Sequence, residues 1–135
     1  MMSEPIEVAA GLIFCEGLLL ITQRPAGGHL AGLWEFPGGK REPGETMPQC
    51  LRRELAEELG VVVNIGQCVE TLTHAYPEKT VRLEFYLCEL VEGEPAGLDG
   101  QQFAWVTVDE LEEYKFPAAD ARLLERLKSE TLWWK

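Results

Sequence analysis

The sequence lacks the features that would place it in a membrane or outside the cell. No apolar run approaches the length that spans a bilayer, and Ser3, Glu4, Pro5 and Glu7 interrupt the start, so we expect neither a membrane segment nor a signal peptide. The cysteines have no C-x-x-C spacing, which favours buried, reduced thiols over zinc sites or disulfides; they are Cys15, Cys50, Cys68 and Cys88. We therefore expect a cytoplasmic protein.

Basic residues are also scarce. The chain of 135 residues has 12 Lys and Arg against 23 Asp and Glu, a formal net charge of -11. This balance argues against binding to a nucleic-acid polymer, which needs basic patches. It does not exclude a small phosphate ligand, because a bound metal inverts the local field. The length predicts one domain over residues 1–135, and the sequence does not distinguish a monomer from a homodimer.

Hydrophobic patterning predicts an alternation of strands and helices. Residues 8–15 and 18–23 read as a hairpin around Glu16-Gly17, and residues 80–91 alternate apolar and polar side chains as a strand does. Further strands are expected at 33–36, 61–65, 67–75 and 103–107, with helices at 46–60, 108–114 and 120–128. No internal repeat is present. The order predicts an α+β fold, an α/β/α sandwich with a central mixed sheet flanked by helices.

Residues 38–61 hold the most informative stretch, GGKREPGETMPQCLRRELAEELGV. Gly38 and Gly39 allow a close backbone approach, and Lys40–Gly44 reads as a charged loop. Thr46 with Gln49 forms a capping box at the start of a helix, and Gly60 ends it. Leu51, Leu55 and Leu59 recur at every fourth position and predict the buried face of this helix.

Acidic residues on this helix predict a metal site. Glu54, Glu57 and Glu58 share one side, because positions i, i+3 and i+4 lie on one face of a helix. Crowded carboxylates favour a hard divalent cation with oxygen ligands, and Mg²⁺ is the expected ion, with Mn²⁺ as a substitute. Arg53 and Glu45 carry opposite charges and are expected to pair, which would hold the carboxylates in place.

The stretch fits the pattern G-x5-E-x7-R-E-U-x-E-E-x-G-U, in which U is a bulky aliphatic residue. Every fixed position is filled, so the stretch resembles the box of the Nudix hydrolase family; the residues are Gly39, Glu45, Arg53, Glu54, Leu55, Glu57, Glu58, Gly60 and Val61. The resemblance implies the Nudix fold and metal-dependent cleavage of a phosphoanhydride. It implies metal ligation by Glu54, Glu57 and Glu58, with the carbonyl of Gly38 as a further ligand. The general base would be Glu54 or Asp99, and Asp99 is alternatively an extra ligand or a turn residue.

HLAGLWEFPGGK, the loop EGEPAGLDGQ and FPAAD extend the resemblance to the MutT branch of this family. That branch removes pyrophosphate from nucleoside triphosphates, notably 8-oxo-dGTP, and so cleans the nucleotide pool. By position, Arg24, His29 and Lys79 would lie near the phosphates or sugar. Phe36, Tyr76 and Leu83 would line the base pocket, although Phe36 and Leu83 also fit plain core packing. Arg24 and His29 also fit an ordinary strand-end charge and an ordinary loop histidine.

Asp120 stands where the best-matched MutT proteins have an Asn. An ionised Asp only accepts hydrogen bonds, whereas Asn also donates, so Asp favours an exposed amino group such as cytosine N4. The first expectation is 8-oxo-dGTP, with CTP, dCTP or 5-substituted cytosine nucleotides as rivals. Asp120 also fits an N-cap of the last helix. Two other functions are a Nudix hydrolase of another nucleoside diphosphate derivative and a sensor that binds a nucleotide without cleaving it.

Overall fold

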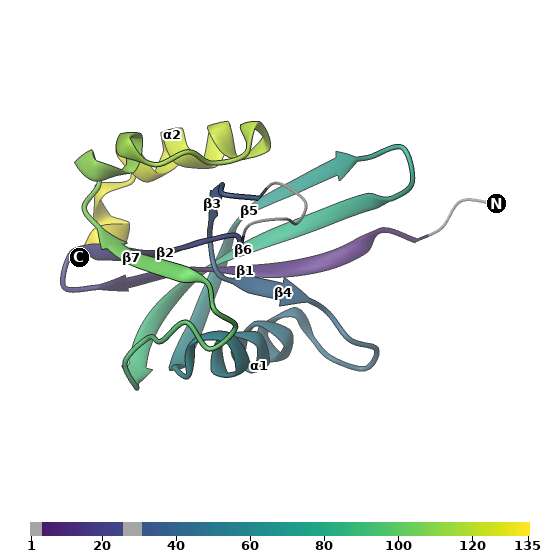
Figure 1. Ribbon diagram of the computed structural model, residues 1–135, viewed down its shortest axis with the longest axis horizontal. Coiled ribbons are helices and arrows are strands. Elements are labelled where there is room, and N and C mark those ends of the chain that lie inside the picture. The colour runs from purple at the N-terminus through teal and green to yellow at the C-terminus, as the bar shows by residue number, and fades with distance from the viewer. Residues whose placement is uncertain (1–3, 26–30) are drawn as a thin grey trace.

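A computed structural model describes residues 4–25 and 31–135 of the protein (Figure 1). The strands are β1 (Ile6–Cys15), β2 (Leu18–Gln23), β3 (Trp34–Glu35), β4 (Gly38–Lys40), β5 (Val62–Ala75), β6 (Thr80–Glu92) and β7 (Gln102–Val106). The helices are α1 (Met47–Leu59) and α2 (Ala121–Ser129), with 3₁₀ turns η1 (Asp109–Glu113), η2 (Ala118–Asp120) and η3 (Thr131–Trp134).

One mixed sheet joins the strands. Its order is β3-β2-β1-β6-β5, with β4 paired to β1 and β7 paired to β2. β1 and β6 run parallel, and the other pairs are antiparallel. α1 covers one face and α2 the other (Figure 1). The predicted α/β/α sandwich with a mixed sheet is therefore confirmed.

The hairpin of β1 and β2 opens after two residue pairs. Phe14 pairs with Leu19 and Cys15 with Leu18, and then the strands separate. β3 pairs with the end of β2, and β4 pairs with β1 opposite Val8–Ala10. The N–H of Gly11 donates to the carbonyl of Pro37 at 2.8 Å. Residues 34–40 thus fill the gap, and Gly38–Lys40, expected as loop, forms strand β4.

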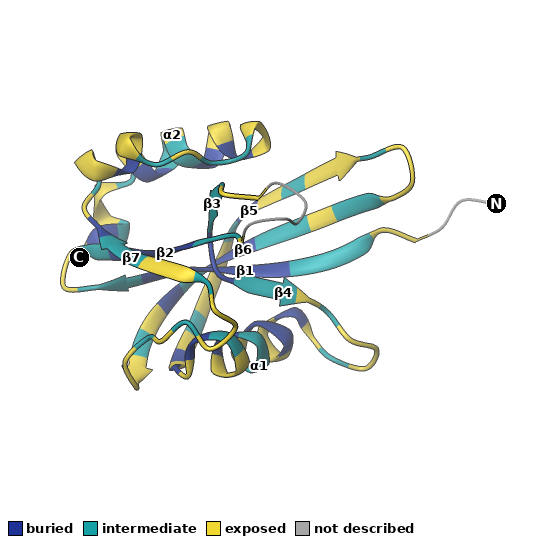
Figure 2. Cartoon of the chain, viewed as in Figure 1, coloured by how far each residue is buried: buried dark blue, intermediate teal, exposed yellow. Residues whose placement is uncertain are grey.

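Two hydrophobic cores lie on the two faces of the sheet (Figure 2). The core under α1 contains Leu51, Leu55 and Leu59, all 0% exposed, as the leucine spacing predicts. The core under α2 contains Leu123 and Leu127 with inward-facing residues of β1, β2 and β6. Each helix is therefore fixed to the sheet by burial of an apolar face.

The ends of α1 are defined by local hydrogen bonds. The N–H of Gln49 donates to Thr46 Oγ1 at 3.2 Å, and the N–H of Thr46 donates to Gln49 Oε1 at 2.9 Å, which is the expected capping box. Gly60 closes the helix at φ 71°, a left-handed conformation that costs glycine little. Both ends of the motif helix are therefore where the sequence predicts them.

The structure differs from expectation in four further places. Residues 61–75 form one long strand from Val62 instead of two. Residues 108–114 give the 3₁₀ turn η1 instead of an α-helix. Asp120 ends η2 and occupies the N-cap position of α2, as expected, but its side chain makes no capping hydrogen bond. Cys68 is exposed and Cys15 is half-buried, so only Cys50 and Cys88 are the expected buried thiols. Among the described residues, no helix is long and apolar enough to cross a membrane.

Candidate active site

β4 brings the glycine pair directly against α1. A Cβ added to Gly39 would lie 2.2 Å from the carboxyl carbon of Glu54, and one added to Gly38 would lie 2.0 Å from the carbonyl oxygen of Ala9. Neither position has room for a side chain. Gly38 is required because the backbone of β1 leaves no space for a Cβ, whereas at Gly39 the space is occupied by the Glu54 carboxylate.

Arg53 holds three glutamates around one guanidinium. Its Nε and Nη2 donate to Glu45 at 2.6 and 3.0 Å, and its Nη1 donates to Glu54 at 3.0 Å and to Glu57 at 3.3 Å. The forked contact keeps the pKa of Glu45 low, at about 2, chiefly through the hydrogen bond from Arg53. The expected pairing of Arg53 with Glu45 is therefore present, and it orients the carboxylates of α1.

The loop before β7 folds back onto the end of α1. The N–H of Leu98 and the side-chain amide of Gln101 both donate to the carbonyl of Glu58, at 3.0 and 3.3 Å. Asp99 lies between them in this loop and is exposed. This contact brings the loop that carries Asp99 to the end of α1, where the charge of Asp99 acts on Glu58, a residue 41 positions away in sequence.

Negative charge accumulates around Glu58. The pKa of Glu58 is raised to about 8, chiefly by burial and then by the charges of Glu54, Glu35 and Asp99 and a hydrogen bond with Glu54. The carboxyl groups of Glu54 and Glu58 interact directly, and such a pair favours a shared proton or a bound cation. The donor set, carboxylate oxygens beside a backbone with no side chain at Gly38 and Gly39, fits a hard divalent metal.

The described part of the chain holds no ready-made group of three or more His, Cys, Asp or Glu side chains around one metal position. Arg53 contacts one oxygen of Glu54 and one of Glu57, which directs both carboxylates toward the guanidinium.

A second polar group lies at the end of β2 and on β3. Arg24 Nε approaches Glu35 Oε1 at 3.1 Å. Burial raises the pKa of Glu35 despite the opposing effect of Arg24. Sequence reasoning missed Glu35, which follows Trp34 in a short strand; its charge acts on both Glu58 and Asp120.

Asp120 is buried, with 8% of its surface exposed. Its pKa is raised to about 6, chiefly by burial and also by the charge of Glu35, against the opposing effect of Arg24. A buried carboxyl group is costly when it is ionised and unpaired, and a pKa raised in this way is typical of a ligand-binding site. The structure thus unites Asp120 with Arg24 and Glu35, although it lies far from both in sequence.

The residues expected to line the base pocket differ in burial and in location. Phe36 is 5% exposed and packs between Phe85 and Phe116, with ring centroids 5.9 and 5.1 Å away. Leu83 is half-buried against the same core. Tyr76 and Lys79 form the turn between β5 and β6, joined by backbone hydrogen bonds of 2.7 and 3.3 Å. His29 lies outside the described residues.

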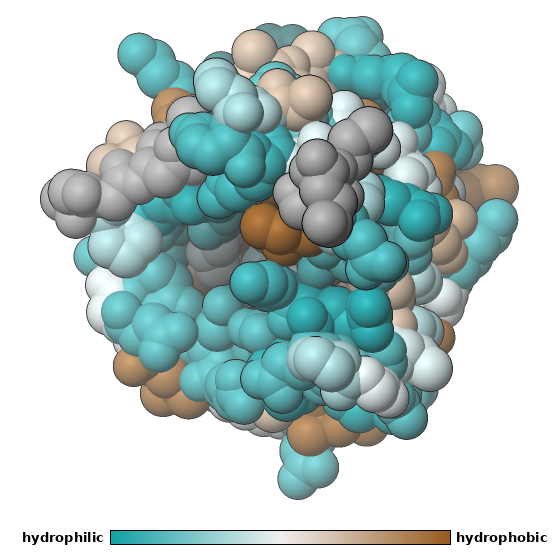
Figure 3. Space-filling view, turned by 90° about the vertical axis from the view of Figure 1, so that its right-hand side faces the viewer, coloured by the Kyte–Doolittle hydropathy of each residue, from teal (hydrophilic) through white to brown (hydrophobic). Residues whose placement is uncertain are grey.

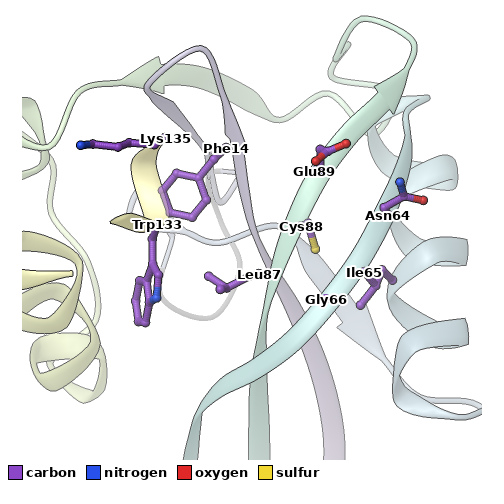
Figure 4. A pocket seen from close by; sticks show the side chains of 9 residues that line it. All are labelled: Phe14, Asn64, Ile65, Gly66, Leu87, Cys88, Glu89, Trp133 and Lys135. Carbon is purple, nitrogen blue, oxygen red and sulfur yellow. The ribbon is translucent and has the colours of Figure 1, made fainter. Parts of the chain in front are cut away.

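Figure 3 shows the end of the molecule at which the turn between β5 and β6 lies, with α2 above and α1 below. The visible surface is largely hydrophilic and is hollowed near its middle. Two other hollows lie elsewhere: one of about 300 Å³ beside Trp133 (Figure 4) and one of about 400 Å³ beside Trp105. No expected site residue lines either of them. The acidic cluster and the group around Asp120 therefore remain the candidate site.

This fold with a carboxylate-bearing helix beside a glycine strand defines the class of metal-dependent hydrolases that the box resembles. The model of the NUDIX domain family matches residues 9–126, and the chain belongs to this family. The family as a whole generally uses a divalent metal.

Curated relatives match over nearly the whole chain. The 8-oxo-dGTP diphosphatase of Haemophilus influenzae is 44% identical over 93% of each chain. The CTP pyrophosphohydrolase of Escherichia coli is 38% identical over 89% of each chain. Among solved structures, MutT of methicillin-resistant Staphylococcus aureus has a TM-score of 0.78 and 32% identity, covering 96% of this chain and 99% of its own.

Proposed function

We propose that this chain is a single-domain nucleoside triphosphate pyrophosphohydrolase, spanning residues 1–135, that cleaves its substrate to the monophosphate and pyrophosphate. The observation that carries the proposal is the contact of Glu54 with the backbone of Gly39, held by the Arg53–Glu45 pair, in a member of the Nudix family. Because of this contact, residues of the Nudix box lie together in the folded chain and form a candidate site.

Glu54, Glu57, Glu58 and the carbonyl of Gly38 would hold a divalent metal, Mg²⁺ or, in its place, Mn²⁺. When bound, the metal supplies positive charge that neutralises phosphate oxygens and makes water more acidic. Its charge would also relieve the repulsion that raises the pKa of Glu58.

The chain itself positions the reacting groups. Arg53 fixes Glu54 and Glu57 from one side, and the loop that carries Asp99 is fixed to the carbonyl of Glu58 from the other. Glu54 and Asp99 are the two carboxylates available to take a proton from water attacking the β-phosphorus. Arg24, His29 and Lys79 would counter the charge of the phosphates or contact the sugar.

The base would lie beside Phe36, Tyr76, Leu83 and Asp120. The first candidate is 8-oxo-dGTP, because a relative with that activity in its name is 44% identical. The outcome would be removal of oxidised nucleotides from the pool. CTP, dCTP or 5-substituted cytosine nucleotides are the second candidate. They are favoured by Asp120, whose carboxylate accepts from an amino group, and by a 38% identical relative named for CTP.

A panel of triphosphates with Mg²⁺ tests the proposal. It contains 8-oxo-dGTP, dGTP, CTP and 5-methyl-dCTP, compared by kcat/KM, with a nucleotide sugar as control. Release of pyrophosphate and a monophosphate from a triphosphate is the expected result. Turnover of the nucleotide sugar with no triphosphate cleaved would overturn it.

We place the enzyme in the cytoplasm, as a monomer or a homodimer acting on free nucleotides. The excess of 23 acidic over 12 basic residues supports a small nucleotide rather than a nucleic-acid polymer as the substrate.

A further inference from the structure

We propose that Glu70, on β5, is a positioning residue that fixes the start of α2 and thereby holds Asp120 at the nucleotide site. This inference rests on the proposed function for its kinetic consequence, but its structural part is independent of activity. A bulge in β5, a buried carboxylate and the short path from Arg122 to Asp120 link Glu70 to that site.

The bulge places Glu70 under α2. Cys68 pairs with Tyr86 and Glu70 pairs with Phe85, so Val69 is an extra residue opposite one step of β6. Tyr86 belongs to the core under α1, whereas Phe85 belongs to the core under α2. In a regular strand Cys68 and Glu70 would share a face. The bulge therefore turns the carboxylate of Glu70 toward α2, a change of direction that bulges provide.

Both arginines of α2 contact this point. Arg122 Nε donates to Glu70 Oε2 at 3.1 Å and its Nη2 donates to Oε1 at 2.5 Å, a two-point contact. Arg126 Nη1 lies 3.7 Å from Oε2 and also donates to the carbonyl of Val69, the extra residue of the bulge. A planar guanidinium bound at two points fixes orientation as well as distance.

The two partners differ in exposure. The Glu70 side chain is 7% exposed, whereas that of Arg122 is 68% exposed. A buried carboxylate without its partner is costly in free energy. Positions of α2 that separate Arg122 from Glu70 are therefore disfavoured. The hydrogen bond from Arg122 keeps the pKa of Glu70 low, and the residue remains an anion at neutral pH.

Little chain separates this contact from Asp120. Asp120 has helical backbone angles, φ -87° and ψ 0°, and passes directly into α2 two residues before Arg122. Its N–H donates to the carbonyl of Pro117 at 3.0 Å. A shift of α2 is therefore transmitted to Asp120 without a flexible linker between them.

The test compares Glu70→Gln and Arg122→Lys with a control, Glu112→Gln. Lys128 Nζ donates to Glu112 Oε1 at 2.9 Å, and this ion pair links the opposite end of α2 to η1. Arg122→Lys retains both charges and loses the two-point contact, so it reports displacement rather than a change of charge. The charges that shift the pKa of Asp120 are those of Glu35 and Arg24, which all three variants keep.

NMR titration of the Asp120 carboxyl is the first measurement. We expect its pKa to fall by about one or more toward 3.8 in Glu70→Gln and Arg122→Lys, and to stay unchanged in Glu112→Gln. With the best triphosphate of the panel, KM should rise about tenfold while kcat stays within about twofold in the first two variants.

A merely structural role would lower Tm and leave the pKa of Asp120 and KM unchanged, which would overturn the inference. If Glu70→Gln does not fold, Arg122→Lys decides, because its side chain is mostly exposed. If the wild-type protein cleaves no triphosphate, the proposed function fails, and the titration still shows whether Glu70 positions Asp120.

Discussion

Replacing Asp120 by Asn should stabilise the protein near neutral pH, and the gain should depend on pH. The carboxyl of Asp120 is buried, and its pKa is raised from 3.8 to about 6. At about 1.4 kcal/mol per pKa unit, the ionised group costs up to about 3 kcal/mol above pH 6. The folded state holds this proton more tightly than the unfolded state, so stability is greatest below pH 3.8 and is lost as the pH rises through 6. Asn removes that loss.

Urea denaturation of both proteins at two pH values measures the effect. At about pH 7.5 we expect Asp120→Asn to gain up to about 3 kcal/mol, and at about pH 4.5 the gain should shrink to about 1 kcal/mol. Other acidic groups cancel in the difference between the two proteins. A gain of equal size at both pH values, or no gain at the higher one, would refute the assignment of a raised pKa to this carboxyl.

The same variant tests how the base is read. Asn adds a donor that the carboxylate lacks, so Asp120→Asn should increase kcat/KM for 8-oxo-dGTP relative to cytosine nucleotides. An unchanged ratio would show that Asp120 does not contact the base. A gain in stability joined to a loss of cytosine preference would identify Asp120 as a residue kept for binding at a cost in stability.

Three further predictions concern the Nudix box and its metal. Glu57→Gln should lower kcat by about a hundredfold or more while Tm hardly changes, because its side chain is 61% exposed; a nucleotide sensor would instead keep its binding response. Gly39→Ala should lower kcat/KM with little change in Tm, since its Cβ would lie 2.2 Å from the Glu54 carboxyl carbon and would displace only the end of that flexible side chain; wild-type kinetics would contradict that contact. Removal of divalent metal by EDTA should stop turnover, Mg²⁺ should restore it and Mn²⁺ should substitute; activity that survives exhaustive chelation would count against the metal assignment.

Local signals predicted the motif helix well. Thr46, Gln49 and Gly60 act through hydrogen bonds and backbone angles within a few residues, and the leucine spacing determines which face is buried. The pairing of Arg53 with Glu45 was also predictable, because the residues are close in sequence and opposite in charge. These features depend on neighbours that the sequence itself places together.

Features that depend on distant neighbours were predicted less well. Strand β4 exists only because β1 and β2 separate and leave backbone groups to pair, which no local pattern in Gly38–Lys40 reveals. Only the fold brings Glu35 close enough to Arg24 and Asp120 for its charge to raise the pKa of Asp120. The bulge at Val69 is set by pairing with β6, so the direction of Glu70 could not be deduced from alternation in β5.

The opened hairpin of β1 and β2 has a consequence for how this enzyme can change. Residues 34–40, which fill the opening, carry Phe36 into the core under α2 and Gly39 against Glu54 of α1. Under the proposed function, a substitution in this segment would therefore affect both the chemistry and the choice of substrate. α2 and Asp120 reach the sheet from the opposite face, attached by side chains alone. Divergence toward a new base can proceed through the last fifth of the chain while the cleavage machinery stays intact.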